Sequence, residues 1–230
     1  MTVSETQKSK TQSLINDCFI QMVEDSSLSH THIVDLIKTL GINRNTFYYY
    51  YSGKYDVAVC IFLRDLADLL LATVPSECLV NLPISDSPHS TQGLPYWTHI
   101  ETGAHELDMS AFVKALGRTM RTKPRFYRML FNPSEREFYQ ALESIWRGAI
   151  SQDLHFILGG RYMPEETKRL LVSLQAQAVN SLCWYFAYHE DDVEALCDDR
   201  INPFSNIMQE AVSRAVQEHP VNRILRRATR

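Results

Sequence analysis

Glycine is scarce in this sequence, and long apolar runs are missing from it. The chain has 8 glycines in 230 residues, and long stretches without turn residues carry apolar side chains at helical spacing. That spacing predicts an all-α fold. Because no apolar run approaches the roughly 18 residues that a membrane helix needs, we expect no membrane-spanning segment and no membrane partner.

Cysteine pairs and excess positive charge are also lacking. The five cysteines are odd in number and include no Cys-x-x-Cys pair, which favours reduced thiols. The first ten residues are polar and lack the apolar core of a secretory signal, so we expect a cytoplasmic protein. The net charge of −4 argues against indiscriminate nucleic-acid binding, but it does not exclude a dimer that touches DNA through one small surface.

Motifs for catalysis are absent as well, since no pattern typical of a catalytic nucleophile occurs. His99, Glu101 and His105 lie close together and carry metal-ligating groups, but their segment has no fixed helical spacing to aim them at one ion. His30 and His32 form only a lone His-x-His pair. We therefore expect no metal and no cofactor, and we do not expect an enzyme.

Apolar periodicity and helix breakers divide the chain into two parts. They predict helices over about 10–24, 31–40, 44–50 and 54–73. A stretch rich in Pro, Ser and Thr follows, for which we expect an irregular connection over 74–103. We accordingly expect a first domain over 1–53, a connecting helix over 54–73 and a second helical domain over 74–230.

Helical spacing resumes in the second part of the chain. It predicts helices over the ranges 108–122, 125–131, 134–158, 164–189 and 203–218. Ser134 and Glu137 have the spacing of a capping box, which predicts that Ser134 is the N-cap of its helix. Pro164 followed by two glutamates is typical of another helix start.

Residues 31–54 have the pattern of a helix-turn-helix. Apolar residues occupy one face of its first helix, at Ile33, Leu36, Ile37 and Leu40. Gly41 can end that helix in the left-handed conformation, and Asn43 is placed to cap the next one. A unit of this kind lays its second helix in the major groove of DNA.

The second helix of this motif presents two faces. Phe47 and Tyr51 are four residues apart, and we assign them to the core. The other face and its flanks carry groups that can reach bases or phosphates, so we expect DNA contacts from Thr31, His32, Arg44, Asn45, Tyr48, Tyr49, Tyr50 and Lys54. Amphipathic packing alone is the other explanation for the run of tyrosines.

Matches to a known pattern extend through this segment, at Thr31, Ile33, Asp35, Leu36, Gly41, Ile42, Arg44, Thr46, Phe47, Tyr48, Tyr51 and Lys54. With them, the chain up to about Ala72 resembles the DNA-binding domain of the TetR (tetracycline repressor-like) family. It looks closest to the branch that includes the regulator of dihydroxyacetone kinase operons. The resemblance implies a homodimeric one-component regulator that binds a palindromic operator. It also implies that an effector in the C-terminal domain moves the fourth helix, and it favours repression over activation.

Two positions and the charge of this region depart from the family pattern. His32 replaces a threonine, and Tyr50 stands where that branch often has histidine. Residues 1–75 carry 6 basic and 8 acidic side chains, a net charge of −2. The departures weaken the expected DNA affinity more than the expected fold. They keep an alternative open, in which a TetR-like coactivator or adaptor acts through a protein partner with weak or no DNA binding.

The second part of the chain offers candidates for a ligand pocket and a dimer interface. Aromatic side chains there can line a pocket for a small-molecule effector or simply fill the core: Phe112, Tyr127, Phe131, Trp146 and Trp184. By the family resemblance, the last two long helices pair with those of a second copy, at Leu171, Leu174, Ala178, Leu182, Ile207 and Ala211. Such a two-fold dimer matches a palindromic operator.

Overall fold

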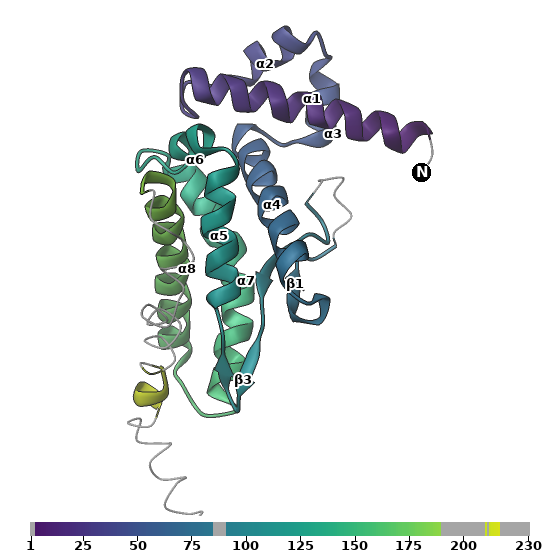
Figure 1. Ribbon diagram of the computed structural model, residues 1–230. Coiled ribbons are helices and arrows are strands. Elements are labelled where there is room, and N and C mark those ends of the chain that lie inside the picture. The colour runs from purple at the N-terminus through teal and green to yellow at the C-terminus, as the bar shows by residue number, and fades with distance from the viewer. Residues whose placement is uncertain (1–2, 85–90, 190–209, 211, 217–230) are drawn as a thin grey trace, which may run out of the picture.

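The computed structural model describes residues 3–84, 91–189, 210 and 212–216, and this part of the chain is predominantly helical (Figure 1). The N-terminal helices are α1 (Val3–Asp25), α2 (Ile33–Leu40), α3 (Arg44–Tyr50) and α4 (Lys54–Thr73). The later helices are α5 (Ser110–Thr122), α6 (Pro124–Leu130), α7 (Arg136–Leu158) and α8 (Glu165–Tyr188). The expected all-α class is confirmed. No helix within the described ranges is long and apolar enough to cross a bilayer.

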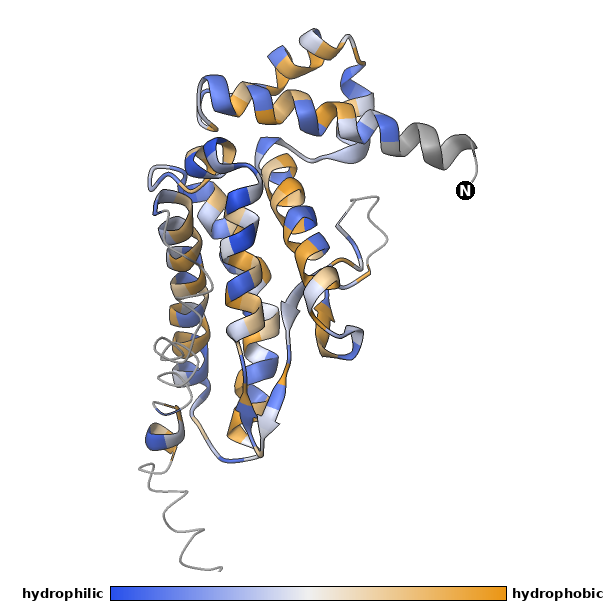
Figure 2. Cartoon of the chain, viewed as in Figure 1, coloured by the Kyte–Doolittle hydropathy of each residue, from blue (hydrophilic) through white to orange (hydrophobic). Residues whose placement is uncertain are grey.

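The helices form a bundle with a smaller unit at one end (Figure 1). Helices α1, α2 and α3 make up that unit, and α4 leads from it into the bundle of α5, α6, α7 and α8. Every residue from Val57 to Leu63 in α4 is buried, because α4 contacts α1, α5 and α7. Figure 2 shows the resulting concentration of apolar residues along α4. This helix therefore links the two parts covalently through a buried apolar segment, and α1 also packs against α6.

The connection between α4 and α5 is more regular than the sequence indicated. A 3-10 turn (Ser76–Cys78) is followed by the strands β1 (Leu79–Asn81), β2 (Pro95–Thr98), β3 (Glu101–Gly103) and β4 (Glu106–Leu107). β1 pairs with β2 and β3 with β4, both antiparallel. The expectation of an irregular connection over 74–103 was therefore wrong for these segments. Strands of two to four residues are too short to show the two-residue periodicity by which a strand is recognised.

The start of α7 also corrects a prediction. The helix begins at Arg136, and its first residue is preceded by a buried Glu135 rather than by a capping Ser134. The hydroxyl of Ser134 instead donates a hydrogen bond to the side-chain oxygen of Asn132, at 2.8 Å. The Ser134 hydroxyl is therefore engaged in a local turn and does not form the predicted capping box.

The turn between α1 and α2 is held from the bundle. A carboxylate oxygen of Glu135 accepts a hydrogen bond from the backbone N–H of Ser29, at 3.0 Å. Arg125 at the start of α6 donates to the carbonyl oxygen of Glu24, at 2.8 Å. These two bonds join the N-terminal unit to α6 and α7 in addition to its covalent link through α4.

Candidate nucleic-acid interface

Two residues set the geometry of the turn between α2 and α3. Gly41 ends α2 with φ of 62°, a left-handed conformation that glycine adopts at low cost. Asn43 begins α3, and its side-chain oxygen accepts a hydrogen bond from the backbone N–H of Asn45 at 2.9 Å. Both expected caps are confirmed. They hold the two short helices in the compact arrangement that a helix-turn-helix needs.

The inner face of α3 is built from two aromatic rings. Phe47 is fully buried and Tyr51 is 1% exposed, which confirms their assignment to the core. The Tyr51 hydroxyl donates to the side-chain oxygen of Asn16 on α1, at 2.5 Å. The hydrogen bond satisfies the only polar atom of the Tyr51 side chain, so α3 is anchored on α1 through this face.

The outer face of α3 gathers four of the predicted DNA contacts. Arg44 and Asn45 are exposed, and Tyr48 and Tyr49 are 45% and 46% exposed. The Arg44 guanidinium carbon lies 5.4 Å from the centre of the Tyr48 ring, and the centres of the Tyr48 and Phe47 rings are 5.3 Å apart with their planes nearly perpendicular. The two contacts favour one orientation of Tyr48. Such a surface carries a cation, an amide and two phenols, which are groups that bind phosphates and base edges.

The remaining predicted contacts lie at the margins of this face. His32 is exposed and precedes α2 without capping it through its side chain, whereas Tyr50 is half-buried against Tyr49. Thr31 is 1% exposed, and its hydroxyl donates to the carbonyl of Ser27 at 2.7 Å. The structure therefore places the Thr31 side chain inside the turn and away from solvent.

Lys54, at the start of α4, has internal partners. Its ammonium group donates to the carbonyl oxygens of Leu28 and Ser29, each at 2.9 Å. An ammonium has three N–H donors, so two are directed at the α1–α2 turn. The structure shows Lys54 as a residue that fastens α4 to this turn, and only its third donor points elsewhere.

The aromatic residues predicted for a ligand pocket occupy two different environments. Four of them are at most 1% exposed and pack in the core: Phe112, Tyr127, Phe131 and Trp146. The indole N–H of Trp146 donates to the side-chain oxygen of Asn180, at 3.0 Å. Trp184 is 37% exposed on α8. Trp184 lines an open surface groove with Arg136 and Tyr139, whereas an apolar cavity beside Trp97 is lined by residues other than the five predicted ones.

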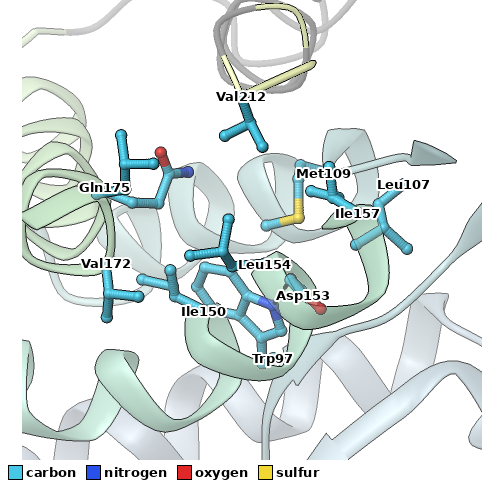
Figure 3. Close-up of a pocket in the computed structure, with 11 residues that line it drawn as sticks. Trp97, Leu107, Met109, Ile150, Asp153, Leu154, Ile157, Val172, Gln175 and Val212 are labelled. Carbon is cyan, nitrogen blue, oxygen red and sulfur yellow. Dashed lines mark hydrogen bonds between the residues drawn. The ribbon is translucent and has the colours of Figure 1, made fainter. Parts of the chain in front are cut away.

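That cavity lies between β2, β4, the start of α5, α7 and α8, and Val212 closes one side (Figure 3). Its volume is about 50 Å³, and nine of its eleven lining residues are apolar. The two exceptions are Asp153 on α7 and Gln175 on α8. The cavity is therefore an apolar space with two polar side chains in its wall.

Asp153 is held by two donors. One oxygen accepts a hydrogen bond from the indole N–H of Trp97 at 2.7 Å, and the other is 2.8 Å from Nδ1 of His99. The carboxylate is buried, and burial raises its pKa above the usual range although both hydrogen bonds act in the opposite direction. Sequence reasoning missed this residue. Its signal is an acid on the apolar face of a helix, one turn from Ile150 and Ile157.

The histidines near this cavity have separate roles. His99 contacts Asp153 and lies 3.5 Å from a carboxylate oxygen of Glu101. His105 instead hydrogen-bonds through Nδ1 to the carbonyl oxygen of Phe156, at 2.9 Å. No group of three His, Cys, Asp or Glu side chains suited to a metal ion occurs among the described residues.

Helix α8 exposes apolar side chains on one side. Leu170, Leu174 and Trp184 are 59%, 51% and 37% exposed. Of the positions predicted for a dimer interface, Leu174 belongs to this exposed set, whereas the partly buried ones are Leu171, Ala178 and Leu182. Ile207 and Ala211 lie outside the described residues. Large apolar side chains at this spacing form a surface that a second helix can cover.

Comparison with known proteins gave matches to solved structures only, three chains in all. No protein-family model matches this sequence, and no curated protein matches it. A solved structure titled "Dihydroxyacetone kinase operon activator DhaS" superposes with a TM-score of 0.45 at 16% sequence identity, over 88% of this chain and 96% of that chain. A likeness at this level carries no conclusion about the function of this chain.

Proposed function

We propose that this protein is a transcriptional regulator that binds operator DNA as a homodimer through α3. The observation that carries the proposal is the division of α3 into two faces. Phe47 and Tyr51 are buried, while Arg44, Tyr48 and their neighbours are exposed on the opposite side. The residue pattern that resembles the TetR family supports the same function, and it favours a repressor whose second domain responds to an effector.

Different residues on the exposed face of α3 would contact base edges and phosphates. Arg44 can reach a guanine edge or a phosphate with its planar guanidinium group, and Asn45 can pair with a base edge. Tyr48 and Tyr49 can donate to phosphates and pack on thymine methyl groups. His32 and the third donor of Lys54 add contacts at the margin. The buried Thr31 side chain takes no part in this arrangement.

The test is a mobility-shift titration with duplex DNA from upstream of the coding sequence and with a randomised duplex pool. We expect a complex whose affinity falls between about 50 and about 200 mM salt, because phosphate contacts release counterions. Tyr48→Ala should weaken binding about tenfold, the effect of losing one hydrogen bond to a charged phosphate.

A matched control is available in Tyr162→Ala. Tyr162 is 47% exposed, close to the 45% of Tyr48, but it lies in the loop between α7 and α8, far from α3 (Figure 1). Its replacement should leave DNA affinity unchanged. Equal affinities for the wild type and the Tyr48 variant would show that the outer face of α3 does not read DNA.

The second domain, over 74–230, supplies the dimer in this proposal. Leu170, Leu174 and Trp184 on α8 would pack against the same side chains of a second copy. Leu174→Glu should convert dimer to monomer in sedimentation velocity, because two glutamates would meet at the interface. Leu71→Glu is the control, since Leu71 is 59% exposed on α4. A Leu174 variant that remains fully dimeric would place the interface elsewhere.

A second candidate function is an adaptor that acts through a protein partner. The observation that favours it is Lys54, whose ammonium is engaged by the carbonyls of Leu28 and Ser29. The net charge of −2 over residues 1–75 points the same way. Absence of any specific complex at low salt, from a folded dimer, would favour the adaptor over the DNA-binding regulator.

A further inference from the structure

The cavity beside Trp97 has two polar side chains in a mainly apolar wall. Asp153 contributes a carboxylate to its wall, and Gln175 contributes a side-chain amide (Figure 3). None of the described residues that line it is Lys or Arg. An anionic ligand would therefore meet a carboxylate with no cation in the wall, which is unfavourable in an apolar surrounding.

Gln175 is the less expected of the two polar groups. Its side chain is 8% exposed, and its oxygen has no hydrogen-bond partner among the described residues. A buried acceptor without a donor costs free energy, so folded proteins satisfy nearly all such atoms. The atom thus marks a place where an N–H or O–H group of a ligand would be stabilised.

Asp153 is bonded but not neutralised. Trp97 brings an uncharged indole N–H, and His99 is 28% exposed and also faces Glu101. No permanent cation among the described residues pairs with this carboxylate. Each carboxylate oxygen can accept a second hydrogen bond, so both retain capacity after the contacts with Trp97 and His99. Desolvation is what raises the pKa of Asp153, and a bound cation would offset that cost.

The size of the cavity limits the ligand. A volume of about 50 Å³ is several times the roughly 10–15 Å³ that one water needs, so the cavity suits a ligand of a few non-hydrogen atoms. The apolar part of the wall, including Ile150, Leu154 and Val172, suits an aliphatic or small aromatic body. The space accommodates a short apolar chain and does not accommodate a large planar compound.

We propose that this cavity binds a small organic amine, with its ammonium group on Asp153 and its apolar body against α7 and α8. A second donor on the ligand, such as a hydroxyl, would satisfy the oxygen of Gln175. The proposal rests on the proposed function only in naming this amine as the effector of a DNA-binding protein. Binding of the amine to the free protein is independent of that function.

The test uses four probes that share a four-carbon chain: butylamine, 4-amino-1-butanol, 1-butanol and butanoate. Each is titrated into the full-length ¹⁵N-labelled protein without DNA, and the three tryptophan indole N–H signals are followed by NMR. The Trp97 indole N–H bonds to Asp153, whereas Trp184 lies on the surface of α8 and serves as an internal reference. Trp97→Phe identifies the Trp97 signal by its loss.

We expect the two amines to shift the Trp97 signal and to saturate it, with 4-amino-1-butanol binding more tightly than butylamine. 1-Butanol should bind about tenfold more weakly than butylamine, which is the effect of one charge-assisted hydrogen bond, and butanoate should not bind. Asp153→Asn should remove the preference for amine over alcohol, and Gln175→Met should remove the preference for the amino alcohol over butylamine.

Glu143→Gln is the matched control, because Glu143 is another carboxylate of α7 that does not line this cavity. The Glu143→Gln variant should bind butylamine with the same affinity as the wild type. Butanoate binding as tightly as butylamine, or a Trp97 signal that no probe moves, would overturn the proposal even if the Asp153 variant does not fold. Amine binding by a protein that binds no DNA would support this inference and contradict the proposed function.

Discussion

Two carboxylates in the bundle are similarly buried but differently satisfied. Asp65 on α4 accepts hydrogen bonds from the ammonium of Lys123 and the hydroxyl of Tyr127. Asp153 on α7 accepts its bonds from the neutral indole of Trp97 and from His99. The side chains of the two acids are 16% and 10% exposed.

The difference separates a structural role from a binding role. The charge of Asp65 is balanced by Lys123, which ties α4 to the start of α6, and the site lies among packed side chains. The charge of Asp153 has no permanent counter-ion among the described residues, and the acid borders a cavity. A buried acid paired with a cation holds helices together, whereas a buried acid without one can bind a cation from outside.

The largest expected effect belongs to Asp65. Asp65→Ala should lower the free energy of unfolding by about 2–3 kcal/mol, towards the low end for a broken buried pair because Lys123 is 31% exposed. Urea denaturation of the free protein measures this. Asp68→Ala, an exposed acid one turn further along α4, is the control and should change stability by less than about 0.5 kcal/mol. Equal changes in the free energy of unfolding for the two variants would show that Asp65 has no special structural role.

Replacing Asp153 should stabilise the protein, whereas replacing Asp65 destabilises it, and the stabilisation should depend on pH. Burial raises its pKa in the folded protein above the usual value of about 3.9. Between those two values the folded state binds more protons than the unfolded state, so this group lowers stability as pH rises. Asp153→Asn cannot ionise, so its stability relative to the wild type should increase from about pH 3.9 upward and then level off above the raised pKa.

Above the raised pKa, Asp153→Asn should exceed the wild type in free energy of unfolding by about 1.4 kcal/mol for each pH unit by which burial raises the pKa of Asp153. Urea denaturation of both proteins at several pH values measures the difference. His99 contacts both Asp153 and Glu101, so Glu101→Gln run in parallel separates the contribution of Asp153 from that of the other acid at His99. A relative stability of the Asn variant that falls with pH would show that the ionised Asp153 stabilises the fold.

Gln175 should give the smallest effect. Gln175→Met keeps the length of the side chain and removes the unpartnered oxygen, so the free protein should become more stable by about 1 kcal/mol. Thermal and urea denaturation both measure this. Gln177→Met, at an exposed position two residues along α8, should be neutral. A Gln175→Met variant that is less stable than the wild type would mean that the amide makes a hydrogen bond. The stabilisation from that bond would then exceed the cost of burying the amide.

Much of the helix-turn-helix could be predicted from the sequence because local chemistry decides it. Gly41 and Asn43 end and begin their helices through their own backbone and side-chain preferences. Phe47 and Tyr51 share a face because helical geometry places residues four apart together. The ends of α3 and α4 follow from such neighbours alone, so tertiary contacts were not needed to find them.

The cavity could not be predicted in the same way because it exists only where distant segments meet. Trp97 and Asp153 are 56 residues apart and come from a short strand and a long helix. Aromatic content pointed to Trp146, but that ring fills the core with its N–H bonded to Asn180. Ser134 was mispredicted for a different reason, because its hydroxyl bonds to Asn132 in a local turn instead of capping α7.

The two hydrogen bonds between the bundle and the α1–α2 turn affect how parts of this chain can be exchanged with those of another protein. The backbone N–H of Ser29 donates a hydrogen bond to Glu135, and the carbonyl oxygen of Glu24 accepts one from Arg125. A chimaera that replaces only residues 1–53 would leave a buried acid and an arginine facing a turn not built for them. New DNA-reading specificity is therefore easier to acquire by changing the outer face of α3 than by transplanting the whole N-terminal unit.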